Sequence, residues 1–150
     1  MSIISLSSGE SAWRGDNYFK DGKVIFVKQK DKNEFVAAVN GSGNNVYAVK
    51  FDTDHPRKSS CDCPHANGKR IICKHIVAAF FAAFLEEAEK YYNEIIEYGK
   101  EEEKRQEELE DKLIKYIDKI SKAELKEMLL ELLFYGPEWQ YDNFIKNHID

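Results

Sequence analysis

The chain has 150 residues, of which 43% are hydrophobic, and a formal net charge of −5 at pH 7. This length and composition suit one globular domain, or a domain with an appendage. No apolar run reaches the roughly 18 residues that a membrane-spanning helix needs, so we expect no such helix.

The N-terminal stretch, residues 1–11, is short and serine-rich. It lacks the basic segment and hydrophobic core of a signal peptide, so we expect a loose arm. Together with the free cysteines, which fall in one cluster, this predicts an intracellular, cytoplasmic protein.

Residues 17–52 have the composition of β-strands. β-branched and aromatic residues dominate three runs, and polar residues at 31–33 and 41–45 separate them. Such runs with polar breaks are typical of strands joined by turns. We therefore predict a three-stranded antiparallel meander, with a short strand near Tyr18 before it. The predicted strands cover residues 23–28, 34–39 and 46–51.

All three cysteines of the chain lie within fifteen residues, as Cys61, Cys63 and Cys73, and His75 completes the pattern C-x-C-x9-C-x-H. Structural zinc sites are tetrahedral and take thiolate and imidazole ligands from two closely spaced pairs. These four residues therefore predict a complete zinc site with three cysteine ligands and one histidine ligand. His65 is a competing ligand. Three ligands within five residues would crowd one side of the metal, which favours His75.

Other interpretations of the cysteines are a disulfide, a redox thiol pair and buried, inert thiols. An odd number of cysteines and the absence of a signal peptide disfavour a disulfide. A redox pair would more naturally be C-x2-C beside a βαβ pattern. We therefore favour zinc.

Apolar residues recur at helical spacing after His75, which predicts a helix over residues 74–98. Between Ile76 and Leu85 the helix is apolar on all sides, so we expect the sheet and the C-terminal region to enclose it. The aromatic residues here are therefore expected in the core.

Residues 99–150 are predicted to form a C-terminal helical region that packs on the domain formed by residues 13–98. Residues 100–111 hold seven acidic and three basic side chains, which favours a solvated helix. Ser121 and Glu124 form a capping box for the next helix, Gly136 and Pro137 end it, and a short helix follows to about His148. The predicted fold class is α+β: an antiparallel meander, a zinc loop leading into a long buried helix, and a helical bundle.

The pattern Cys61, Cys63, Cys73, His75 followed by an apolar helix resembles the SWIM zinc finger. The resemblance extends to the β-rich segment before it and covers about residues 13–85. It implies a module that binds DNA or protein. The family occurs in helicase-like ATPases, transposases and recombination factors, but this chain carries none of their enzymatic motifs. The upstream residues that carry the resemblance are Arg14, Gly15, Tyr18, Phe19, Gly22, Lys23, Val24, Val39, Asn40, Gly41, Ser42, Tyr47, Ala48 and Val49.

Charge divides unevenly, with net +4 over residues 1–85 and net −9 over residues 86–150. Basic residues around the zinc motif form a modest positive patch that could contact a phosphate backbone. The acidic tail argues against avid non-specific binding, and a protein partner for its helices is the alternative. We expect a non-enzymatic adaptor, because the chain has no phosphate-binding loop, no nucleophile motif and no open zinc position. The candidate nucleic-acid-binding residues are Arg57, Lys58, Lys69, Arg70 and Lys74.

Overall fold

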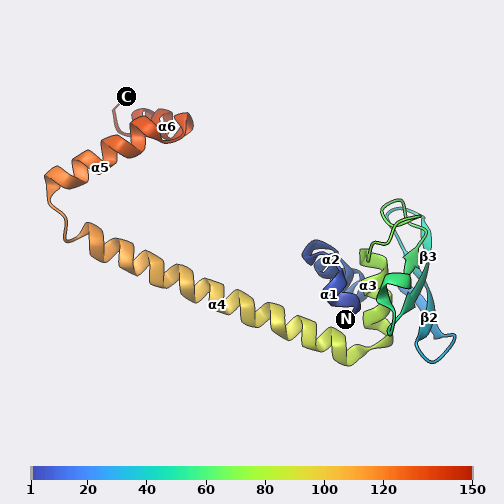
Figure 1. Cartoon of the computed structure of the whole chain (residues 1–150). Helices are drawn as coiled ribbons and strands as arrows, with labels where there is room; N and C mark the ends of the chain where they lie inside the picture. The colour runs from blue at the N-terminus through green and yellow to red at the C-terminus, as the bar shows by residue number, and fades with distance from the viewer. Residues whose placement is uncertain (1, 150) are drawn as a thin grey trace. The chain divides into compact units, whose positions relative to one another are not determined.

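The computed structural model describes residues 2–149. The chain divides into two compact units, Met1–Glu97 and Tyr98–Asp150. The first contains a four-stranded antiparallel sheet, and long helices follow it, which confirms the α+β class (Figure 1). Among the described residues, no helix combines the length and the apolar character needed to cross a membrane.

The sheet is a meander of four strands in the order β1-β2-β3-β4. The three predicted strands are confirmed to within one residue at each end. The fourth strand was not predicted, because it is only two residues long and follows a short 3-10 helix, η1 (Pro56–Lys58). The strands are β1 (Val24–Gln29), β2 (Glu34–Asn40), β3 (Val46–Asp52) and β4 (Ser60–Cys61).

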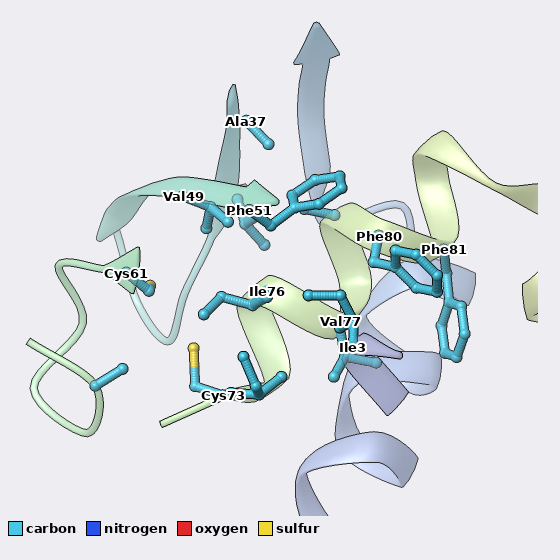
Figure 2. Close-up of a cluster of buried hydrophobic side chains, with 14 of the residues drawn as sticks. Ile3, Ala37, Val49, Phe51, Cys61, Cys73, Ile76, Val77, Phe80 and Phe81 are labelled. Atoms are coloured by element: carbon cyan, nitrogen blue, oxygen red, sulfur yellow. The ribbon is translucent and has the colours of Figure 1, made fainter. Parts of the chain in front are cut away.

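Helix α3 (Lys74–Ala83) packs on one face of this sheet and forms the core with it. Its residues from His75 to Phe81 are all buried. Figure 2 shows Cys61 and Cys73 at the end of the core near Ile76, and Phe80 and Phe81 at the other end. The cysteine cluster is thus continuous with the hydrophobic core.

The predictions of a loose N-terminal arm and of a short strand near Tyr18 were wrong. That part of the chain forms two helices, α1 (Ile3–Leu6) and α2 (Gly9–Lys20). Ile3 is 1% exposed, so this segment is part of the core and not a loose arm. Helix α2 packs closely on α3, and a Cβ atom at Gly15 would lie 2.5 Å from the Val77 side chain. Within the first unit, α3 therefore lies between the sheet and α2 (Figure 1).

The predicted helix over residues 74–98 is also wrong in its bounds. Helix α3 ends at Ala83, and Phe84 has the non-helical angles φ −131° and ψ 80°. The Phe84 ring packs against Phe35 and Phe80, with centroid distances of 5.3 Å and 5.1 Å. A new helix, α4 (Leu85–Ile117), then continues past Gly99, where the change of composition suggests an end.

The second unit contains the end of α4, then α5 (Lys122–Tyr135) and α6 (Glu138–His148). The predicted capping box is confirmed: the Ser121 hydroxyl accepts a hydrogen bond from the Glu124 backbone N–H, and the Glu124 carboxylate accepts one from the Ser121 backbone N–H. Helices α5 and α6 contact each other but bury none of their residues fully.

Candidate metal centre

Four ligand side chains meet at one end of the core. Cys61 comes from β4, Cys63 from the following loop, and Cys73 and His75 from the N-terminus of α3. Their ligand atoms all lie within 4.8 Å of one another, and all four residues are buried. The Nδ1 atom of His75 lies 3.7 Å from Cys61 Sγ and 3.8 Å from Cys73 Sγ.

These distances fit a zinc ion. Zinc–sulfur bonds of about 2.3 Å and zinc–nitrogen bonds of about 2.0 Å place two tetrahedral ligands about 3.5 to 3.8 Å apart. Three thiolates and one imidazole complete a four-coordinate structural site. The prediction of a zinc cofactor is therefore confirmed, and the four residues predicted as its ligands lie together.

The electrostatics of the thiols also favour a cation. A hydrogen bond from Cys61, with further ones from His75 and the backbone N–H of Ile76, lowers the pKa of Cys73 to about 4. The proton that Cys61 shares with Cys73 raises the pKa of Cys61. The hydrogen bond thus favours the thiolate form of Cys73 and the protonated form of Cys61. A divalent cation can replace this proton and stabilise both sulfurs as thiolates.

Aromatic packing orients the His75 ring so that Nδ1 faces the sulfurs. The ring contacts Tyr47 at a centroid distance of 4.7 Å and Tyr18, in a T-shaped arrangement, at a centroid distance of 5.4 Å. Its Nε2 atom is buried and makes no hydrogen bond within the described residues. In a metal-bound imidazole, the N–H of this second ring nitrogen usually donates a hydrogen bond to an acceptor. Here ring packing from β3 and α2 replaces that hydrogen bond.

His65, the competing ligand, is exposed and lies outside the cluster. The loop explains this, because the backbone N–H groups of Ala66 and Asn67 both donate to the Cys63 carbonyl and close a tight turn. Gly68 follows with φ +70°, a conformation that favours glycine, and leads the chain back toward Cys73. The three cysteines are free, so the disulfide interpretation does not apply.

A groove of about 730 Å³ lies beside the zinc loop, which is the segment 62–72 between β4 and Cys73. The groove is bounded by that loop, η1 and the edge of the sheet. Its lining includes Ala48 of β3 and both residues of β4. We call it the basic groove, because its charged lining residues are Lys50, Arg57, Lys58, Lys69 and Arg70, with Asp62 as the one carboxylate.

Local hydrogen bonds hold the walls of the basic groove. The Asp62 carboxylate accepts a hydrogen bond of 2.9 Å from the Ala48 N–H, which ties the zinc loop to β3. Asp52 accepts hydrogen bonds from the N–H groups of His55 and Asp54, at 2.7 Å and 2.8 Å, and so shapes the turn before η1. These hydrogen bonds lower the pKa of Asp52, and the one from His55 has the largest effect. Both carboxylates thus accept hydrogen bonds from backbone N–H groups, although cationic side chains lie nearby.

The structure brings together four of the five candidate nucleic-acid-binding residues. Lys74 lies apart from them: its ammonium donates a 2.7 Å hydrogen bond to the Tyr18 hydroxyl, which lowers the pKa of Tyr18. Lys50 was missed, because only the pairing of β3 with β4 places it in the groove. The role of α2 was missed as well, although the Ser8 cap and the Asp16–Lys20 pair are helix signals in the sequence.

The fold and the four-ligand cluster define a zinc-binding α+β module. Residues 44–84 match the family model of the SWIM zinc finger, so the chain carries a SWIM zinc finger in that segment. The match covers β3, η1, β4, the zinc loop and α3, and it leaves α1, α2, β1, β2 and the C-terminal helices outside. Comparison with curated proteins and with solved structures gave no match.

Proposed function

We propose that this protein is a non-enzymatic zinc-binding adaptor that binds nucleic acid, in particular DNA, through the basic groove. One observation carries the proposal: five cationic side chains line a single concave surface beside the zinc loop. They come from β3, η1 and the zinc loop, segments that are separate in the sequence.

The groove suits a phosphate backbone in charge and in accessibility. All five cationic residues are exposed, so their charges are available to a ligand. The single carboxylate of the lining, Asp62, is engaged with a backbone N–H. Lysine and arginine that replace counterions on phosphates provide the sequence-independent part of nucleic-acid affinity. The net charge of −5 for the whole chain limits that affinity and makes it sensitive to salt.

In this proposal zinc has a structural role. Four protein ligands complete a tetrahedral shell, whereas catalytic zinc keeps a position open for water or substrate. The ion joins β4 and the zinc loop to α3, and both β4 and the loop contribute walls to the basic groove. Zinc therefore supports nucleic-acid binding by holding the shape of the groove.

Replacing Lys69 and Arg70 by alanine should weaken DNA binding to a similar extent for all sequences. The two changes remove two phosphate contacts, so the slope of log K against log salt concentration should fall by about 1 to 2. Fluorescence anisotropy with a labelled oligonucleotide, titrated over a range of salt concentrations, measures both quantities.

The matched control replaces Lys100 and Lys104 of α4, which changes the net charge of the protein by the same amount. This control should keep both the affinity and the salt slope of the wild type. Equal losses in the two double variants would show that binding depends on net charge alone, and the basic groove would lose its role. Zinc content is measured for each variant to verify its fold.

A protein partner is the second candidate, and the C-terminal helices favour it. Helices α5 and α6 carry leucine, methionine and aromatic side chains, yet no residue of either helix is buried within their own unit. Those side chains need another apolar surface, on residues 13–98 or on a separate acceptor. If the wild type binds no DNA or RNA even at low salt, the protein-partner function stands alone.

A further inference from the structure

In the unit Met1–Glu97 the helices pack on one face of the sheet. Ala37, Val39, Val49 and Phe51 are buried on that face against α3, and the residues between them in the strands are more exposed. Among the described residues of this unit, no α-helix packs on the opposite face, and η1 and the zinc loop reach it only beside β3 and β4. We call that opposite side the outer face.

Two adjacent rows of side chains cross the middle of the outer face, as the strand register shows. Phe26, Ala38 and Ala48 are direct neighbours in the first row. Lys28, Val36, Lys50 and Ser60 form the second row. Neither row contains a carboxylate within the strands, although Asp62 adjoins Ala48 and the next row pairs Glu34 with Asp52. Asp62 and Asp52 both accept hydrogen bonds from backbone N–H groups. The first row presents one aromatic ring beside two small side chains, and the second places a lysine on β1 and another on β3.

A β-bulge puts Phe26 on the outer face. Val24 pairs with Val39, but the next pair is Phe26 with Ala38, so Ile25 is the extra residue on β1. Val24 and Val27 both pack against the core, whereas Ile25 and Phe26 are 52% and 45% exposed. In a regular strand, alternation would turn Phe26 to the same side as Val24 and bury it. Bulges re-aim side chains in this way, often at functional positions.

The outer face and the basic groove form one continuous surface. Ala48 and Lys50 belong both to the rows of the outer face and to the lining of the groove. On the other side, the Lys28 ammonium lies 5.8 Å from the centroid of the Phe26 ring. Positive charge therefore extends from the zinc loop across β3 to the exposed aromatic ring, about 14 Å across the sheet given the usual strand spacing.

We propose that this surface binds single-stranded nucleic acid, with a base stacked on Phe26 and the backbone running across Lys28 and Lys50 into the basic groove. The inference rests on the proposed function and specifies its ligand. Unpaired bases expose their faces to an aromatic side chain, whereas a duplex keeps its bases stacked inside. The charge of the two rows selects a polyanion over an apolar protein surface, because both lysines would lose their hydration against the latter.

The test uses the full chain and two ligands: a thymidine oligonucleotide of about ten residues, within the usual site size, and an abasic oligonucleotide of the same length and charge. Phe26→Leu should weaken binding of the thymidine oligonucleotide about fivefold or more, the loss expected for one stacked base. Binding of the abasic ligand should not change. The salt slope should stay the same for both ligands, because no charge is removed.

Ile25→Ala is the matched control, since it trims an equally exposed apolar neighbour on the same strand and should keep wild-type affinity. Unchanged thymidine binding by Phe26→Leu, or an equal loss for the abasic ligand, would overturn the stacking role. Neither result would affect the basic groove. Absence of binding to every oligonucleotide by the wild type would instead overturn the proposed function itself, so the two failures are distinguishable.

Discussion

Removal of the zinc should unfold the zinc loop and the start of α3, and should lower the melting temperature of the protein strongly. Structural zinc contributes an apparent binding free energy of about 10 to 16 kcal/mol at neutral pH, which is as large as the whole stability of a typical domain. Here the ligands join β4, the loop and α3, so that energy holds the sheet to the helix.

Circular dichroism melting before and after treatment with a strong chelator measures the effect, and added zinc should restore the original curve. Lower pH should act in the same direction as the chelator, because protons compete with the metal for the three thiolates and the imidazole. A melting curve that does not move after metal analysis has verified zinc removal would show that the site is peripheral to the fold.

Phe81→Ala should destabilise the protein by about 3 to 5 kcal/mol, the usual cost of emptying a buried phenylalanine site. Phe81 is fully buried and lies between Phe19 of α2 and Tyr91 of α4, with centroid distances of 6.2 Å and 5.3 Å. Loss of its ring should therefore loosen α2 and the first turns of α4 together. Urea denaturation followed by circular dichroism measures the loss.

Trp13→Ala provides the control for this measurement. Trp13 lies on α2 but is 55% exposed, so its replacement should change the stability by no more than about 0.5 kcal/mol. Zinc content should persist in Phe81→Ala, because Phe81 and the ligand cysteines lie at opposite ends of the core (Figure 2). Similar losses in the two variants would contradict the role of Phe81 as a core residue.

The metal site could be predicted from the sequence because its ligands are close in the chain. Cysteine and histidine at short spacing imply one site with little knowledge of the fold. The structure brings Cys61, Cys63, Cys73 and His75 into one cluster. The strands were predictable for a similar reason, since β-branched runs and polar turns are local signals. In both cases the information lies within a few residues.

Features that depend on tertiary contacts were harder to predict. The break at Phe84 arises from packing against Phe35 and Phe80, whereas helix propensity favours continuation. The N-terminal helices carry only modest apolar stripes, and their burial depends on α3. Lys50 enters the basic groove only through strand pairing, and the bulge that exposes Phe26 has no clear sequence signal.

Zinc stoichiometry in three single variants tests the central claim, that Cys61, Cys63, Cys73 and His75 hold one structural zinc ion. The account predicts one zinc per chain in the wild type and in His65→Ala, and a loss of zinc in His75→Ala. His75→Cys should restore binding, because a fourth thiolate completes a four-cysteine site. Full stoichiometry in His75→Ala together with zinc loss in His65→Ala would contradict the account.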